Sequence, residues 1–234
     1  MDNNLAAVIQ PDNTASYPVG MPVRKPPADR RDELLRAAVG VLAQRGFSAV
    51  TLRDVAAEAG VAHGLLRHYF STRGELLAAA FDLAAAEDLD HLPDHRSTPA
   101  THLLQRCAPP ADQHYLLWID AWSEAPRSPE LAVILRRHHS SCERAARAAI
   151  AAGAADGTWT CADPAGAATT FEAQLDGLAV QLYALRRVSR RDYRRLATAA
   201  AEALLGLAPG GLAAAARAEQ PAPARAEQPA PARA

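Results

Sequence analysis

The chain has 234 residues, and its 25 Lys and Arg against 26 Asp and Glu give a formal net charge of −1, so the overall charge gives no sign of a nucleic-acid partner. No apolar run reaches the ~18 residues that a membrane span needs, which excludes a membrane-spanning protein. The three cysteines, Cys107, Cys142 and Cys161, are widely spaced, which excludes a disulfide framework and favours a reducing compartment.

The charges are unevenly distributed along the chain. Residues 24–80 carry nine Arg or Lys and six Asp or Glu, a net of +3, whereas residues 81–211 carry thirteen and sixteen, a net of −3. This asymmetry is typical of a DNA-reading head on a neutral-to-acidic body. The first thirty residues lack the basic-then-apolar pattern of a signal peptide, so we expect a cytoplasmic, nucleoid-associated protein.

Composition predicts four parts. Residues 1–28 are rich in Pro and Gly and show no hydrophobic period, which predicts a flexible N-terminal arm. Residues 29–88 and 89–211 carry helical patterns and form the expected two domains. Residues 212–234 contain an eight-residue Ala- and Pro-rich repeat and predict a disordered tail.

The punctuation between these ends is helical throughout, and no alternating strand pattern is present. Start signals recur in the form of an N-cap oxygen followed by an acidic residue or a proline, as in Thr51-x-x-Asp54 and Ser128-Pro129. The sequence predicts an all-α fold. The expected helices are 30–45, 52–59, 63–70, 73–91, 99–107, 112–125, 129–152, 164–187 and 190–206.

Residues 51–70 predict a helix, a tight turn and a second helix. Val55 and Ala56 lie on the apolar face of the first helix, Gly60 suits a turn with positive φ, and Leu66 and Phe70 anchor the second helix. The second helix can then present its polar face to a DNA major groove. The combination predicts a helix-turn-helix DNA-binding domain.

Residues 30–81 resemble the DNA-binding domain of the TetR family of transcriptional repressors. The matching residues are Arg31, Ala37, Gly46, Phe47, Thr51, Val55, Ala56, Ala59, Gly60, Val61, Gly64, Leu66, Tyr69, Phe70, Glu75, Leu76 and Leu77. The stretch 64–70 resembles the subgroup of choline-sensing BetI repressors. The chain departs from the family pattern at Ala62, where a serine is frequent, at Arg67, where a tyrosine is usual, and at Arg73, where a lysine is usual.

The resemblance implies which residues contact DNA. The expected base-facing residues are His63, Gly64, Leu65 and His68, and the expected phosphate-facing residues are Thr51, Arg53, Arg67, Tyr69 and Arg73. Core packing is the alternative for Tyr69, and a solvated surface position is the alternative for Arg53.

The resemblance also implies a small-molecule effector bound among the middle helices. The candidate ligand-binding residues are His114, Trp118, Trp122, Trp159, Phe171, Gln174 and Tyr183. Trp118 and Trp122 share one helical face at i and i+4 and could stack on a planar ligand or hold a cation. An ordinary core position is the alternative for each of them.

A homodimer follows from the same interpretation, because one recognition helix covers few base pairs. Two recognition helices related by a twofold axis read a near-palindrome with half-sites ~34 Å or more apart. The last two long helices are the expected interface, and internal packing is the alternative. The candidate dimerisation residues are Leu178, Leu182, Tyr193, Leu196, Ala200 and Leu204.

We therefore expect a repressor that binds double-stranded operator DNA and is released by its effector, with the helix at 73–91 transmitting the change. A DNA-binding activator or a ligand-independent regulator remains an alternative. A metal-responsive protein is another, using His138, His139 and Cys142 with a further ligand such as Cys107 or His114. No catalytic motif is present, so we expect no enzyme, no cofactor and no metal.

Overall fold

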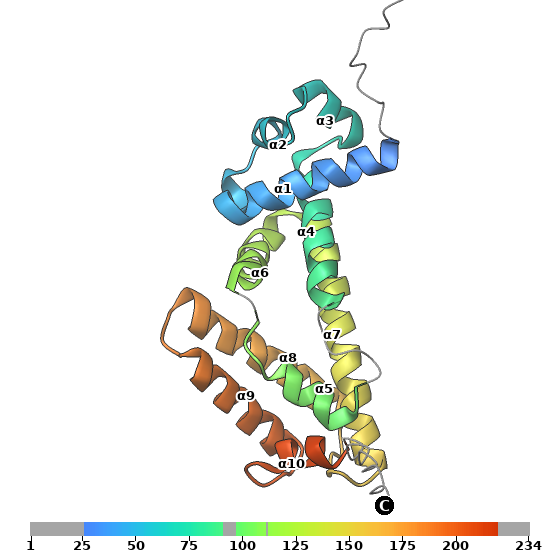
Figure 1. Cartoon of the computed structure of the whole chain (residues 1–234), viewed down its shortest axis with the longest axis vertical. Helices are drawn as coiled ribbons and strands as arrows, with labels where there is room; N and C mark the ends of the chain where they lie inside the picture. The colour runs from blue at the N-terminus through green and yellow to red at the C-terminus, as the bar shows by residue number, and fades with distance from the viewer. Residues whose placement is uncertain (1–25, 91–96, 111, 220–234) are drawn as a thin grey trace, which may run out of the picture.

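The computed structural model describes residues 26–90, 97–110 and 112–219, and within these ranges it contains helices and no strand, which confirms the all-α prediction (Figure 1). The elements are α1 (Pro27–Ala49), α2 (Leu52–Glu58), α3 (His63–Tyr69), α4 (Arg73–Asp90), α5 (Pro99–Arg106), α6 (Asp112–Glu124), the 3-10 turn η1 (Ala125–Arg127), α7 (Pro129–Ala155), α8 (Pro164–Ala179), the π-helical turn η2 (Val180–Ala184), α9 (Arg190–Leu204) and α10 (Gly211–Ala218).

The first three helices form a head at one end of the molecule (Figure 1). Thr51 begins α2 with a capping box, in which its hydroxyl accepts from the Asp54 N–H and its own N–H donates to the Asp54 carboxylate. Gly60 turns the chain with φ 64°. Leu66 and Phe70 are fully buried and hold α3 against the rest of the head.

Helix α1 is interrupted near its end by Gly46, whose φ of 73° and ψ of 166° are not helical. The kink places Phe47 in the core, where only 1% of its surface is exposed and its ring meets Phe81 of α4 edge-on. Phe47 therefore joins the head to the helix that leads into the body.

The body consists of α4 to α10 and contains a second core. The first core includes residues of the head, Leu117 and Ala121 of α6, and Leu131 and Leu135 of α7. The second core lies among α5, α7, α8, α9 and α10, at the end of the molecule away from the head (Figure 1). Helices α6 and α7 therefore share a hydrophobic core with the DNA-reading head.

The C-terminal boundary differs from the expectation. Residues 212–218 belong to α10, not to a disordered tail, because Leu212 is fully buried and Ala216 is 5% exposed. Glu202 accepts from the Leu212 N–H, and Glu219 accepts from the Ala100 N–H at the start of α5. At the other end, α1 begins at Pro27, so residues 27 and 28 are helical. Residues 1–25 and 220–234 lie outside the described residues.

The end of α8 also differs from the expectation of one helix over 164–187. The α-helix ends at Ala179, and η2 continues the chain with a π-type hydrogen bond from the Leu185 N–H to the Val180 carbonyl. Tyr183 lies in this turn and donates to the Pro110 carbonyl, which ties η2 to the segment before α6.

Candidate functional site

The outward face of α3 is the first candidate surface. His63, Gly64, Leu65, Arg67 and His68 are all exposed, while Leu66 between them is buried. Leu65 is a large apolar residue that is 37% exposed. The five residues that the resemblance assigned to DNA contact on this helix thus lie on one accessible surface, which has the width of a single helix.

Tyr69, Thr51 and Arg53 lie at the edges of that surface. Tyr69 packs partly against the head core, and its ring lies 5.5 Å from that of His68. The Thr51 hydroxyl donates to the Asp54 carboxylate at 2.6 Å, so its helix-capping role already occupies it. Arg53 is exposed. Asp54, in turn, has a lowered pKa because Thr51 donates two hydrogen bonds to it.

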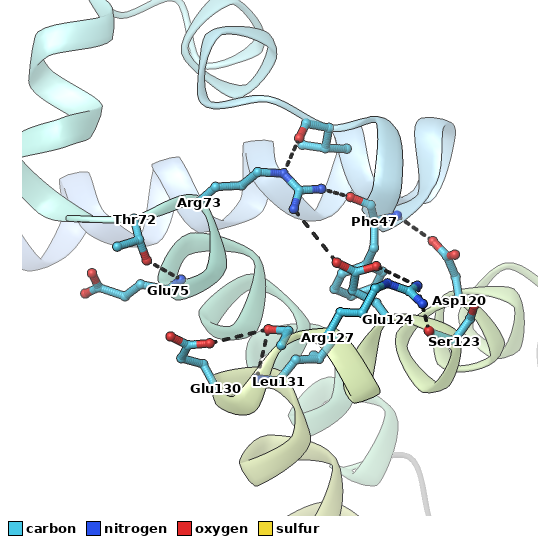
Figure 2. Close-up of polar contacts among 12 residues, drawn as sticks. Phe47, Thr72, Arg73, Glu75, Asp120, Ser123, Glu124, Arg127, Glu130 and Leu131 are labelled. Atoms are coloured by element: carbon cyan, nitrogen blue, oxygen red, sulfur yellow. Dashed lines mark hydrogen bonds and ion pairs between the residues drawn. The ribbon is translucent and has the colours of Figure 1, made fainter.

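Arg73 has a different placement from the expected phosphate contact. Its Nε donates to the Val50 carbonyl at 2.7 Å, and its guanidinium also donates to the Phe47 carbonyl. Glu124 of α6 lies 4.0 Å from the same guanidinium (Figure 2). These bonds stabilise the segment between α1 and α2, so we remove Arg73 from the phosphate-contacting set.

A second polar contact crosses from the body to the same segment. The Phe47 N–H, freed by the kink at Gly46, donates to Oδ2 of Asp120 at 2.5 Å (Figure 2). A Cβ added at Gly46 would lie 2.7 Å from that oxygen, so both the positive φ and the close approach favour glycine there. The sequence analysis missed Asp120, although it lies within the expected ligand-binding helix between the two tryptophans.

Trp118 and Trp122 lie in an aromatic cluster between α6 and its neighbours. The two indole rings are 6.3 Å apart, and Phe81 of α4 meets Trp118 edge-on at 5.0 Å. Tyr115 lies 5.7 Å from Trp122 and stacks on Tyr183 of η2 at 5.6 Å. Three of the expected ligand-binding residues, Trp118, Trp122 and Tyr183, are therefore connected through Tyr115.

Polar groups border the aromatic cluster on the side of α7 and α8. The Trp122 indole N–H lies 3.1 Å from Nε2 of His139, and the Tyr115 hydroxyl donates to the Asp176 carboxylate at 3.0 Å. Burial raises the pKa of Asp176, although its contacts with His139 and Tyr115 oppose this, and burial beside Asp176 raises the pKa of Tyr115. A half-buried carboxylate next to aromatic faces can hold an organic cation.

The other expected ligand-binding residues do not join this cluster. Trp159 donates from its indole to the Ile150 carbonyl at 2.9 Å and, like Phe171, is buried in the second core. Gln174 is exposed on α8. The His114 side chain lies outside the described residues. Tyr115, His139 and Asp176 were missed, since residue type alone did not show which faces of α7 and α8 turn toward α6.

The expected dimerisation residues divide into two groups. Tyr193 is 2% exposed and its hydroxyl lies 3.5 Å from the Leu175 carbonyl, so the alternative of internal packing applies to it. The others are half-buried and lie along α8, η2 and α9. They are Leu178, Leu182, Leu196, Ala200 and Leu204.

The residues of the metal-binding alternative make other contacts. Nε2 of His138 lies 2.8 Å from Oδ1 of Asp82, and the neighbouring His139 faces Trp122. Burial raises the pKa of Cys107 to about 12 and that of Cys142 to about 11, so both thiols are protonated at neutral pH. Among the described residues, no group of three or more His, Cys, Asp or Glu side chains is arranged to hold a metal ion.

The length and polarity of the helices bear on a membrane location. In the part of the chain that the structure describes, every helix is too short or too polar to cross a bilayer.

Comparison with known proteins identifies the family. Residues 34–80 match the family model of bacterial regulatory proteins of the tetR family, and residues 101–206 match that of the BetI-type transcriptional repressor C-terminal domain. The transcriptional regulator BetI of Brucella anthropi is 32% identical over 181 residues, which cover 65% of this chain and 93% of that protein. The regulator PksA of Bacillus subtilis is 42% identical over 65 residues, 28% of this chain and only 32% of PksA.

Solved structures agree with the sequence relatives. A TetR-family transcriptional regulator from Rhodococcus sp. matches with a TM-score of 0.64 and 26% identity, over 76% of this chain and 99% of that one. A transcriptional regulator from Saccharomonospora viridis, solved in complex with choline, matches with a TM-score of 0.65 and 20% identity, over 74% and 95% of the two chains. With its helix-turn-helix head and BetI-type body, this chain belongs to the TetR family of DNA-binding transcriptional regulators and is BetI-like.

Proposed function

We propose that the protein is a homodimeric repressor that binds a palindromic operator and is released by a small-molecule effector. The exposed face of α3 carries this proposal, because Leu65, Arg67 and His68 are accessible together although only Leu66 of that turn is needed for packing. A leucine side chain can contact the methyl group of thymine, and an exposed arginine can contact phosphate.

The operator is found by recovering genomic fragments bound to the purified protein and measuring their affinity against random duplex. We expect the specific duplex to bind about 10³-fold or more tightly than the competitor, with a twofold-symmetric footprint. A reporter placed behind the operator then distinguishes repression from activation, which depends on where the operator lies. Binding without any sequence preference would contradict the proposal.

The half-buried surface of α8, η2 and α9 is our proposed dimer interface. Leu196 and Leu204 lie two turns apart on α9 and leave a partly accessible apolar face there. We expect Leu196→Arg to shift the mass measured by light scattering toward that of one protomer, because it places a charge in an apolar contact. The exposed Arg194→Ala is the control. A wild-type chain that stays monomeric would rule out this arrangement.

We further propose that the effector is an organic cation held by the aromatic cluster and Asp176. The complex of the Saccharomonospora viridis regulator with choline supports a methylated ammonium as the probe. The ring faces of Trp118 and Trp122 supply cation–π attraction, and the Asp176 carboxylate lies on the same side of the body, bonded to Tyr115.

Tryptophan fluorescence tests this proposal. Choline should quench the emission of the wild-type protein saturably, and its uncharged carbon isostere should bind more weakly. Asp176→Asn should reduce choline affinity about tenfold or more, since it removes the one charge that balances the ligand. The same variant should be more stable than the wild type near neutral pH, because burial opposes ionisation of Asp176. Equal affinity of choline and its isostere would contradict a cation site.

A further inference from the structure

Helix α6 presents two sets of side chains on opposite faces. Successive residues of an α-helix are rotated by about 100°, so Trp118 and Trp122 share one face while Asp120 and Glu124 share a face about 200° away. The tryptophans belong to the aromatic cluster, and the carboxylates contact the head (Figure 2). One helix of thirteen residues thus touches both the proposed effector site and the DNA-reading head.

The head segment that α6 contacts is the link between α1 and the helix-turn-helix. It begins at the kink of Gly46 and ends at Val50, directly before Thr51 caps α2. Because of the kink, the Phe47 N–H has no acceptor within α1, and Asp120 of the body supplies one at 2.5 Å. The hydrogen bond is charge-assisted and partly buried, which places it among the stronger contacts that a protein makes.

Arg73 connects the same link to α6 from the other side. It donates to the carbonyls of Phe47 and Val50, and its guanidinium lies 4.0 Å from Glu124. Glu124 is itself held by Arg127, which also donates to the Ser123 carbonyl at the end of α6. A shift of α6 therefore changes contacts at both ends of the link between α1 and α2.

We propose that α6 couples the effector site to the head, with Asp120 as the positioning residue that fixes the kinked link of α1. This inference rests on the proposed function, in which an effector occupies the aromatic cluster. It adds a second route to the expected one through α4, since Asp120 contacts the link directly rather than through the helix that follows the recognition helix. The coupling is reciprocal, so operator binding also favours the α6 position that keeps the Asp120 bond.

The experiment uses the full-length chain with Asp120→Ala, which removes the acceptor, and Asp120→Asn, which keeps an oxygen but loses the charge. Amide hydrogen exchange at Phe47 should become about tenfold faster or more in Asp120→Ala, with a smaller increase in Asp120→Asn. Asp156→Ala is the matched control, because that carboxylate accepts the Thr158 N–H within a turn of the body and does not contact the head. Unchanged exchange at Phe47 in both Asp120 variants would overturn the proposal.

A double-mutant cycle measures the coupling without a ligand. Trp122→Leu alters the aromatic face of α6, and its effect on operator affinity is measured in the wild type and in Asp120→Ala. If α6 transmits the change through Asp120, the loss of affinity in the double variant is less than the product of the two single losses by about threefold or more. Losses that multiply as independent effects would overturn the proposal.

Choline then separates this inference from the proposed function. In the wild type it should weaken operator binding by a factor typical of allosteric coupling, about 5–150-fold. Asp120→Ala should still quench with choline at similar affinity while that factor falls toward one. A variant that keeps the full factor overturns the α6 route. A wild type that does not bind choline overturns only the effector class, and the exchange measurement and the mutant cycle still decide the role of α6.

Discussion

Asp82 of α4 and His138 of α7 are joined by a contact of 2.8 Å between Oδ1 and Nε2, and Arg137 donates to the same carboxylate oxygen. Burial alone would raise the pKa of Asp82, but the hydrogen bonds from Arg137 and His138 outweigh burial and lower it. The two helices run side by side from the head into the body (Figure 1). The contact therefore fixes α4, which follows the recognition helix, on a helix of the body.

The first prediction concerns this contact. Because the pKa of Asp82 is lower in the folded protein, its contribution to stability is complete above the unfolded pKa of about 3.9 and is lost as the pH falls through the folded value. We expect Asp82→Asn to lower the melting temperature at pH 7 by a few degrees, about 2–4 °C for each kcal/mol of stability removed. The gap to the wild type should narrow below about pH 4. A constant gap at every pH would contradict this assignment.

The second prediction concerns His102 of α5. This histidine is buried, its Nε2 atom has no hydrogen-bond partner, and burial together with the nearby Arg106 lowers its pKa. The unfolded chain therefore binds a proton more readily, so His102 costs stability as the pH falls below about 6.5. We expect His102→Leu to flatten the loss of melting temperature between pH 7 and pH 5, about the range where histidine titrates. Parallel curves for wild type and variant would exclude His102 as the cause.

The third prediction concerns α10, which packs against α5. Leu212→Ala should destabilise the protein by about 2–5 kcal/mol, because the side chain is fully buried and leaves a cavity. Leu116→Ala on α6 is the matched control, since that leucine is 50% exposed, and it should change stability far less. Thermal melts of the two variants check the difference. Similar losses of stability in both would mean that α10 does not contribute to the core.

The head could be predicted from the sequence because its signals are local. The capping box of Thr51 and Asp54, the turn at Gly60 and the anchors Leu66 and Phe70 all lie within twenty residues and specify the helix-turn-helix directly. The expected α2 and α3 agree with the structure to within a residue at each end.

The contacts between head and body could not be predicted in this way. Phe47 and Asp120 are 73 residues apart, and nothing in the sequence marks an aspartate between two tryptophans as a partner of a distant backbone amide. Similarly, the Ala-rich stretch of α10 contains little apolar area, which favours a tail over a packed helix when only the sequence is considered. Its one leucine, Leu212, is nevertheless enough to dock the helix on the second core.

The fourth prediction separates the two arginines at the edge of the reading head. Arg67 is exposed, and we expect Arg67→Ala to weaken operator binding and to reduce the slope of log affinity against log salt by about 0.9 for each phosphate that the side chain neutralises. Arg73 is bonded to the Phe47 and Val50 carbonyls, so Arg73→Ala should lower the melting temperature and leave the slope nearly unchanged. Salt titrations of operator affinity check both, and a reduced slope for Arg73→Ala would restore it to the phosphate-contacting set.

The last prediction compares two helical glycines. A Cβ added at Gly64 of α3 or at Gly40 of α1 would meet no other atom within 4 Å, so neither glycine is needed for packing within the protomer. Glycine in a helix costs up to about 1 kcal/mol relative to alanine, so both Gly64→Ala and Gly40→Ala should raise the melting temperature.

Operator binding should distinguish the two variants. Gly64 lies on the exposed face of α3 beside Leu65, where an added methyl group would occupy the space that the DNA needs. We therefore expect Gly64→Ala to lower operator affinity about tenfold, an amount equivalent to about 1.4 kcal/mol, while Gly40→Ala leaves it unchanged. If Gly64→Ala stabilises the protein and binds the operator as tightly as the wild type, then the DNA does not approach this face of α3 closely, and base contacts must come from elsewhere on the head.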